Sequence, residues 1–264
     1  MPARPVAPLL SSSLKASRRL QAVRSHTPLT STILDPTAIQ RAIPQIRNMS
    51  SAMSKRLEGK TIVVTGASSG IGRSVAQEFA RTSPKNLKII LTARRIDTLK
   101  QVAADINKEV GDGVKVLPVQ LDISKPEEVK AFVPNLPEEF KDIDILVNNA
   151  GLVKGVAKAP EIAAEDMNIM FATNVTGLIN MTQAVMEIYK KRDEGGRGDI
   201  INIGSIAGRE GYPGGSIYCA TKAAVRTFTD SLRRELIATR IRVMEVDPGQ
   251  VETVCAILGM VRAY

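Results

Sequence analysis

Between residues 57 and 253, short apolar runs alternate with longer segments in which apolar and polar positions recur at helical spacing. Runs that are apolar almost throughout are typical of strands buried on both faces of a parallel sheet. Six such strands are predicted, at Lys60–Thr65, Leu87–Ala93, Val114–Gln120, Ile143–Asn148, Asp199–Ile203 and Ile241–Val246.

Helical segments separate these strands. Parallel strands joined by right-handed helical crossovers build a doubly wound sheet, so the expected fold class is α/β, a Rossmann-type sheet of six strands. Helices are predicted at Gly72–Arg81, Ile96–Glu109, Pro126–Phe140 with an interruption at Pro134, Ala164–Lys190 and Ser216–Ala238.

The N-terminal segment, residues 1–56, does not share this pattern. It is rich in Ser, Pro, Arg and Ala, and its first fifty residues carry a charge of +6 with a single acid, Asp35. This bias is typical of an organellar transit peptide. It also fits a disordered arm, or a gene start placed too far upstream, with Met49 or Met53 as the working initiator.

The rest of the composition narrows the function classes. Outside the arm the charge is only about +3, and Trp is absent, so nucleic-acid binding is not expected. Neither Cys219 nor Cys255 has metal-ligand spacing and the single His26 lies in the arm, which argues against a metal site. No apolar run reaches the roughly 18 residues of a membrane span. We expect a cytoplasmic protein, or a mitochondrial one if residues 1–48 are a transit peptide.

A glycine-rich loop, Thr65-Gly66-Ala67-Ser68-Ser69-Gly70-Ile71-Gly72, joins the first strand to the first helix. Its glycines permit a tight turn and close approach to a pyrophosphate, while the helix N-terminus offers free N–H groups. This position favours a dinucleotide site over a plain turn. The expected cofactor contacts are Gly66, Ser68, Ser69, Gly70, Ile71 and Gly72.

Arg94 and Arg95 follow the second strand, where an NAD-preferring site carries an acid for the ribose 2′-hydroxyl. Guanidinium groups suit a 2′-phosphate instead, so we predict NADP(H) as cofactor. The alternative is that both arginines cap the strand in solvent. Asp122, after the third strand, is placed to reach the adenine amino group, to cap the next helix near Ser124, or both.

Tyr218 and Lys222 lie four residues apart in a predicted helix, which puts them on one face, one turn apart. An unperturbed phenol has a pKa of about 10, too high for an efficient base near neutral pH. A nearby ammonium group favours the phenolate and lowers that pKa. The pair therefore predicts proton exchange with a substrate alcohol or carbonyl, and Lys222 could also bind the cofactor ribose.

Three further polar residues accompany this pair. Ser205 follows the fifth strand and Asn149 the fourth, and both strands end at the edge where such sheets bind ligands. We expect Ser205 to hydrogen-bond the substrate oxygen and Asn149 to contact the cofactor. Asn174 lies in the middle of a predicted helix, where Asn is disfavoured. It is either a buried packing amide or the holder of a water near Lys222.

Together these features resemble the short-chain dehydrogenase/reductase family over about three-quarters of the chain. The motifs are TGASSGIG, LDI, NNAG, the helix Asn, the strand-end Ser, YCATK and DPGQVET. The resemblance implies a catalytic tetrad in which Tyr218 is the acid/base, Ser205 polarises the carbonyl, Lys222 tunes Tyr218 and holds the ribose, and Asn174 orders a relay water. It also implies that Thr253 contacts the nicotinamide carboxamide.

Within the family, EEFKDIDILVNNAG and GSIAGREGYPGGSIYCATKAAVRTFTDSLRREL look like fungal NADP-dependent 3-hydroxy acid dehydrogenases. This implies hydride transfer between NADP(H) and a small 3-hydroxy acid, such as serine or L-allo-threonine, in a homodimer or homotetramer. Family members usually continue well past Thr253 into a seventh strand and a substrate lid, a pattern that the tail at 254–264 does not match. The alternatives are a broad carbonyl or 3-oxoacyl reductase, or a truncated, poorly active nucleotide-binding protein.

Overall fold

The computed structural model of the protein describes residues 52–251. The basic arm up to residue 51, the expected cofactor contact Thr253 and the tail at 254–264 lie outside the described residues. The predicted domain limits therefore stay predictions. Residues 52–57 form a short helix, which overlaps the last residues assigned to the arm.

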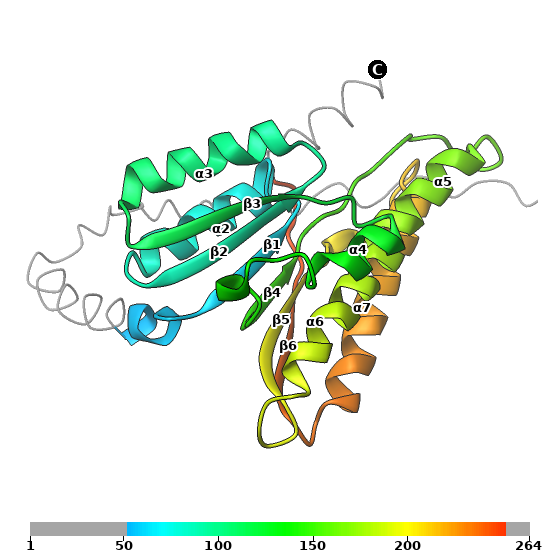
Figure 1. Ribbon diagram of the computed structural model, residues 1–264. Coiled ribbons are helices and arrows are strands. Elements are labelled where there is room, and N and C mark those ends of the chain that lie inside the picture. Colours follow the sequence, from blue (N-terminus) through cyan, green and yellow to red (C-terminus); the bar gives the residue numbers. More distant parts are fainter. Residues whose placement is uncertain (1–51, 252–264) are drawn as a thin grey trace, which may run out of the picture. The chain divides into compact units, whose positions relative to one another are not determined.

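The described residues form a six-stranded sheet in which every neighbouring pair of strands is parallel. The spatial order β3-β2-β1-β4-β5-β6 confirms the doubly wound fold expected from the sequence. The chain runs from β1 outward through β2 to β3 (Figure 1). It then crosses back past β1 to β4, where the second half of the sheet begins. The strands are β1 Thr61–Thr65, β2 Leu87–Ala93, β3 Val114–Gln120, β4 Ile145–Asn148, β5 Arg197–Ile203 and β6 Arg240–Val246.

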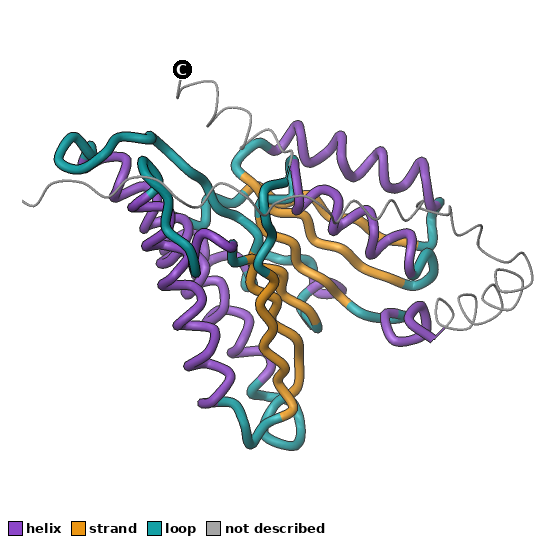
Figure 2. The backbone as a smooth tube through the Cα atoms, turned by 180° about the vertical axis from the view of Figure 1, so that it is seen from behind, coloured by secondary structure: helices purple, strands orange, loops and turns teal. Residues whose placement is uncertain are grey.

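Helices cover both faces of the sheet, as Figures 1 and 2 show from opposite sides. The helices are α2 Gly70–Thr82, α3 Ile96–Val110, α4 Pro126–Phe132, α5 Ala164–Phe171, α6 Leu178–Tyr189 and α7 Ser216–Glu235. The described residues also form two short 3₁₀ turns, η1 Glu138–Phe140 and η3 Ile206–Gly208, and a π-helical segment, η2 Ala172–Gly177.

Two predicted helices differ from the observed ones. The segment predicted at Pro126–Phe140 forms α4 only as far as Phe132, and a 3₁₀ turn follows, because Pro134 and Pro137 cannot supply the N–H groups of a continuing helix. The stretch predicted at Ala164–Lys190 is continuous, but its middle is the π-helical η2.

Alternate residues of the buried strands feed two hydrophobic cores. Ile62 and Val64 of β1 pack in the core beneath α2 and α3, whereas Val63 packs in the core beneath α4, α6 and α7. All three side chains are fully buried. A sheet buried on both faces explains why its strands read as unbroken apolar runs in the sequence.

Two features of residues 52–251 concern the membrane and metal sites considered above. No helix in this range is long and apolar enough to cross a bilayer. No group of three or more His, Cys, Asp and Glu side chains in the same range is arranged to hold a metal ion.

Candidate active site at the carboxyl edge of the sheet

The residues singled out in the sequence gather where the strands end. In a doubly wound sheet, ligands bind outside the carboxyl ends of the strands at the point where the strand order reverses. Here that point lies between β1 and β4, which are hydrogen-bonded neighbours. The glycine loop follows β1 and Asn149 follows β4, so both lie at the reversal.

The glycine loop has the backbone that its glycines were expected to permit. Gly66 and Gly70 have positive φ angles of 67° and 56°, a region that L side chains rarely adopt. A Cβ atom on Gly66 would lie 2.8 Å from Cα of Ala150, and one on Gly72 would lie 2.7 Å from the carbonyl oxygen of Gly66. Side chains at these two positions would therefore collide with the loop's own backbone and with Ala150, so glycine is needed for this close-packed turn, the cradle at the start of α2.

Asn149 and Thr65 brace this cradle. The Asn149 Nδ2 atom donates hydrogen bonds to the carbonyl oxygens of Thr65, at 2.8 Å, and Gly66, at 3.3 Å. The Thr65 hydroxyl donates to the carbonyl oxygen of Val147 and accepts from the backbone N–H groups of Asn149 and Ala150. The ends of β1 and β4 are thus locked together directly below the loop.

Arg95 reaches the loop from the end of β2. Its Nη2 atom donates to the Ser68 hydroxyl at 3.4 Å, while the Arg95 and Arg94 side chains are otherwise exposed. A forked cation beside the cradle suits a phosphate ester better than a neutral hydroxyl. Asp122 Oδ1 accepts from both the backbone N–H and the hydroxyl of Ser124, which makes a local turn before α4 and not a cap of that helix.

Tyr218 and Lys222 lie one turn apart on α7, as predicted. Lys222 is only 6% exposed, and its Nζ atom donates a hydrogen bond of 2.8 Å to the carbonyl oxygen of Ile203. The same Nζ lies 5.8 Å from the centroid of the Tyr218 ring. Because Ile203 is the last residue of β5, this bond fixes the lysine at the carboxyl edge of the sheet.

Asn174 is 1% exposed and uses the wider turn of η2 to face the same place. Its amide exchanges two hydrogen bonds of 2.8 Å with the backbone of Leu152 and donates a third, of 3.1 Å, to the Thr221 hydroxyl. A Cβ atom on Gly151 would lie 3.3 Å from Asn174 Oδ1 and 3.7 Å from Lys222 Nζ. Asn174 and Lys222 therefore meet around Gly151.

Ser205 is held by Asp247, the residue that follows β6. Its backbone N–H donates to Asp247 Oδ1 at 3.1 Å, and its hydroxyl accepts from the N–H of Ala207, which caps η3. Asp247 also pairs with Arg209 at 2.6 Å. Burial, followed by the neighbouring carboxylate of Asp247, raises the pKa of Glu245.

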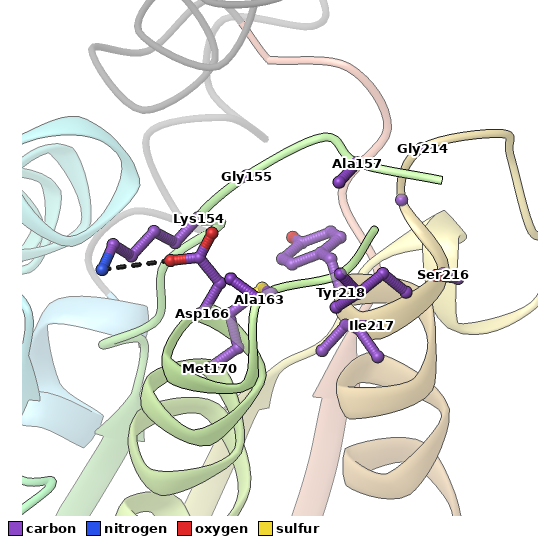
Figure 3. A pocket seen from close by; sticks show the side chains of 12 residues that line it. Lys154, Gly155, Ala157, Ala163, Asp166, Met170, Gly214, Ser216, Ile217 and Tyr218 are labelled. Atoms are coloured by element: carbon purple, nitrogen blue, oxygen red, sulfur yellow. Dashed lines mark ion pairs between the residues drawn. The ribbon is translucent and has the colours of Figure 1, made fainter. Parts of the chain in front are cut away.

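A small pocket opens beside Tyr218 (Figure 3). The Tyr218 side chain projects into it from α7, and its hydroxyl is turned toward the side where Lys154 and Asp166 lie. The opposite wall is formed by Gly214, Ser216 and Ile217, at the start of α7. The lining residues are Lys154, Gly155, Ala157, Ile162, Ala163, Asp166, Met170, Gly214, Gly215, Ser216, Ile217 and Tyr218.

Comparison with known proteins agrees with this geometry. The family model described as short chain dehydrogenase matches residues 60–257, which include the glycine loop and the Tyr218–Lys222 pair. This chain belongs to the short-chain dehydrogenase family.

Relatives within the short-chain dehydrogenases are close. An NADP-dependent 3-hydroxy acid dehydrogenase of Schizosaccharomyces pombe is 50% identical over 198 residues, 75% of this chain and 74% of the relative. A serine 3-dehydrogenase of Rhizobium radiobacter is 39% identical over 193 residues, 73% of this chain and 72% of the relative. The closed form of a serine dehydrogenase complexed with NADP⁺ superposes with a TM-score of 0.67 at 37% identity, covering 76% of this chain and 77% of that one.

Sequence reasoning named residues that the fold brings to this edge of the sheet, but it did not name the residues that support them. In the sequence, Thr65 looks like an ordinary β-branched strand residue. Only its position at the strand end indicated that its hydroxyl could join two strands. Asp247 lies in the DPGQVET motif, but its bond to Ser205 depends on the pairing of β5 with β6. Lys154 and Asp166 stand in a loop and a helix start that carry no motif.

Proposed function

We propose that this short-chain dehydrogenase transfers a hydride between NADP(H) and the hydroxyl-bearing carbon of a small 3-hydroxy acid. It is an oxidoreductase of CH–OH groups, as its named relatives are. The observation that carries the proposal is the buried Lys222 ammonium beside Tyr218, at the carboxyl edge of β5 and next to a pocket. The 50% identity to a 3-hydroxy acid dehydrogenase supports the substrate class.

The chain's own residues fit a phosphorylated dinucleotide. The glycine turn from Gly66 to Gly72 would present backbone N–H groups at the start of α2 to the pyrophosphate. The guanidinium groups of Arg95 and Arg94 would hold the 2′-phosphate that distinguishes NADP from NAD. The remaining predicted cofactor contacts, among them Asp122 and Thr253, are part of the same proposal. Bound NADP⁺ supplies the acceptor for the substrate's hydride.

Tyr218 handles the proton. Oxidation of the alcohol breaks a C–H bond, whose electron pair leaves as hydride, and an O–H bond, whose proton passes to the Tyr218 phenolate. The carbon–oxygen double bond of the product forms as the O–H electrons move inward. Lys222, whose ammonium has little water around it, stabilises the phenolate before the transfer. Ser205 donates a hydrogen bond to the substrate oxygen in both directions of the reaction.

Asn174 acts behind this pair. Its amide joins the Leu152 backbone to Thr221, the residue next to Lys222, and so fixes the space around the lysine. An ordered water held there gives the proton of Tyr218 an exit through Lys222. The homo-oligomer and the cytoplasmic or mitochondrial location expected from the sequence remain predictions.

Substitution of Tyr218 by Phe tests the proposal. Removing the phenol oxygen should lower kcat for NADP⁺-dependent oxidation of 3-hydroxypropanoate by about 10²- to 10⁴-fold, the usual weight of a general base. NADP⁺ binding, measured by calorimetry, should be unchanged, because the cradle is untouched.

Tyr189→Phe is the matched control. Tyr189 is fully buried and donates to the backbone carbonyls of Asp144 and Asp199, at the amino side of the sheet. It should keep its kcat at temperatures where it is folded, although it is less stable. A Tyr218→Phe enzyme with wild-type kcat would contradict the proposed role of Tyr218.

A further inference from the structure

Thr221 is a buried hydroxyl residue in the turn of α7 that separates Tyr218 from Lys222. Its side chain is 0% exposed. The Thr221 Oγ1 atom donates a hydrogen bond of 2.7 Å to the backbone carbonyl oxygen of Tyr218 and accepts one of 3.1 Å from Asn174 Nδ2. A hydroxyl has a single proton, so the bond to the Tyr218 carbonyl leaves the lone pairs of Thr221 for the Asn174 amide.

The Asn174 amide uses this hydroxyl to complete its hydrogen bonding. One N–H group donates to the Leu152 carbonyl oxygen, the amide oxygen accepts from the Leu152 N–H, and the second N–H group donates to Thr221. The bonds to Leu152 fix which end of the amide is oxygen, and Thr221 supplies the remaining acceptor. Because Asn174 is 1% exposed, loss of that acceptor would leave a buried N–H group without a partner, which is costly.

This hydrogen bond joins two elements that carry different parts of the proposed proton path. Asn174 belongs to the π-helical η2, whereas Tyr218 and Lys222 belong to α7. Asn174 Oδ1 and Lys222 Nζ lie on either side of Gly151, within 3.3 Å and 3.7 Å of a Cβ atom placed there. A displacement of η2 from α7 would therefore open the space around the Lys222 ammonium. Water entering that space would weaken the attraction between the ammonium and the Tyr218 phenolate.

We propose that Thr221 is a positioning residue for the proton transfer. Its hydroxyl ties the Asn174 amide to the Tyr218 turn of α7, which keeps water away from the Lys222 ammonium and so stabilises the phenolate. The inference rests on the proposed function and adds a residue that the predicted tetrad does not include. Thr221 acts through Asn174 and the Tyr218 backbone and not by contact with the substrate.

The same helix repeats the arrangement about two turns further on, at Thr229. Thr229 is also 0% exposed, and its hydroxyl donates to the Val225 carbonyl oxygen at 2.7 Å and accepts from Asn202 Nδ2 at 2.8 Å. Asn202 lies in β5 and is not a member of the predicted tetrad. Thr221 and Thr229 therefore match in burial and bonding, and they differ in whether the partner amide belongs to the proposed active site.

Thr221→Val removes the hydroxyl and keeps the shape of the side chain. We expect kcat for NADP⁺-dependent oxidation of 3-hydroxypropanoate to fall by about 10- to 100-fold, because a misplacement of about 1 Å can cost about 100-fold in rate. The acidic limb of the pH profile of kcat should move to higher pH, since a less stabilised phenolate forms at higher pH. Thr221→Ser retains the hydroxyl and should restore the wild-type profile.

Thr229→Val is the matched control. Each valine variant leaves a buried amide N–H group without its acceptor, so both should lower the urea midpoint of unfolding by similar amounts. At temperatures where it is folded, Thr229→Val should keep kcat within about twofold of wild type and leave the pH profile unchanged. A purely structural role for Thr221 predicts that the two valine variants behave alike in all three measurements.

Ionisation of Tyr218 gives a readout that needs no substrate. The chain has four tyrosines and no tryptophan, so phenolate formation can be followed by near-ultraviolet absorbance. Burial raises the pKa of Tyr189 above its ordinary range, and the difference between wild type and Tyr218→Phe isolates the Tyr218 signal. This phenol should ionise at a higher pH in Thr221→Val than in wild type, and at the wild-type pH in Thr229→Val.

Different outcomes separate the two proposals. If wild type oxidises no 3-hydroxy acid with NADP⁺, the proposed function fails, and the ionisation of Tyr218 still decides whether Thr221 stabilises the phenolate. If wild type is active and Thr221→Val keeps the wild-type kcat, pH profile and Tyr218 ionisation, only the role of Thr221 is overturned. A loss of kcat without a shift in Tyr218 ionisation, or an equal shift in Thr229→Val, would show that the hydroxyl merely supports the fold and would overturn it as well.

Discussion

Lys222 carries a buried positive charge at the proposed active site. Taking an ammonium out of water is costly unless it is paired or hydrogen-bonded. Here it is 6% exposed, donates to the Ile203 carbonyl and lies 5.8 Å from the Tyr218 ring centroid. The charge therefore gains most when negative charge develops on the Tyr218 oxygen, which is the step that the proposed mechanism requires.

Glu245 and Asp247 bring two carboxylate groups close together beside Gly204. Gly204 lies so close to both carboxylates that a Cβ atom there would collide with Asp247 and Glu245. The Oε1 atom of Glu245 is buried with no hydrogen-bond partner among the described residues. Asp247 meanwhile holds the Ser205 N–H and Arg209. Protonation of Glu245 relieves the repulsion between the two acids.

This predicts a pH effect on stability. Because burial and Asp247 raise the pKa of Glu245 in the folded state, the folded protein binds this proton more tightly than the unfolded chain. The stability that this bound proton contributes is complete below the ordinary carboxyl pKa. It is lost as the pH rises through the raised pKa of Glu245. The Gln side chain of Glu245→Gln does not titrate, so the free energy of unfolding of this variant, relative to wild type, should increase between about pH 4 and pH 8.

Urea unfolding at the two pH values measures this difference. Glu187→Gln, on the exposed face of α6, is the control and should show no pH-dependent change relative to wild type. If Glu245→Gln also tracked wild type at both pH values, Glu245 would not be the titrating group.

Residue-scale prediction from the sequence succeeded where the partners are local. Tyr218 and Lys222 share one helix, so their spacing alone places them on one face. The Asp247–Ser205 bond joins residues 42 apart and exists only because β6 pairs with β5 in a particular register. The Lys154–Asp166 pair depends on a loop conformation, which a hydrophobic pattern does not encode.

At the element scale, the segment from α5 to α6 shows what periodicity misses. The apolar spacing predicts one helix, and the backbone does continue from Ala164 to Tyr189. The π-helical η2 within it changes the hydrogen-bond register, and π segments are frequent at functional sites. The sequence signal was Asn174, a poor residue for a helix interior, and its burial against Leu152 and Thr221 explains its place there.

At the end of α6, the Tyr189 ring packs directly against Gly198 of β5. A Cβ atom on Gly198 of β5 would collide with the Tyr189 ring, whose atoms are fully buried. Gly198→Ala should therefore lower the free energy of unfolding by about 1–3 kcal/mol through overpacking, measured as a lower urea midpoint at constant slope. A ring held by two backbone hydrogen bonds cannot move aside without breaking them.

Gly211→Ala is the matched control for this substitution. Nothing lies within 4 Å of a Cβ atom at Gly211, and its φ angle is not positive. Its stability should stay within about 0.5 kcal/mol of wild type. Equal stability of the two alanine variants would mean that the Tyr189 ring does not constrain β5.

At the scale of the whole molecule, the reversal of strand order between β1 and β4 brings the two halves of the sheet together at the site. The first half contributes the glycine loop and Arg95, and the second contributes Asn149, Ser205 and α7. The alternation of strands and helices, with right-handed crossovers, was enough to predict this plan. The alternation did not predict the side-chain hydrogen bonds at the reversal, such as the one from Asn149 to Thr65, because these bonds join the two halves of the sheet.

A cofactor that touches both halves should stabilise the entire domain. A ligand at 100 times its Kd adds about 2.7 kcal/mol to the folded state. For a domain of this size that raises Tm by about 5–10 °C. Thermal unfolding with NADP⁺ should show this shift, and NAD⁺ at the same concentration should give a smaller one, because Arg95 gains nothing from a 2′-hydroxyl.

Arg95→Ser should bring the shifts with NADP⁺ and NAD⁺ close together, since the guanidinium beside Ser68 is then gone. Lys108→Ser is its matched control: an exposed cation in the last turn of α3, on the side of the sheet away from the strands' carboxyl ends. It removes the same formal charge and should preserve the NADP⁺ preference. Loss of preference in both variants would point to net charge, and retention in both would leave the 2′-phosphate to residues other than Arg95.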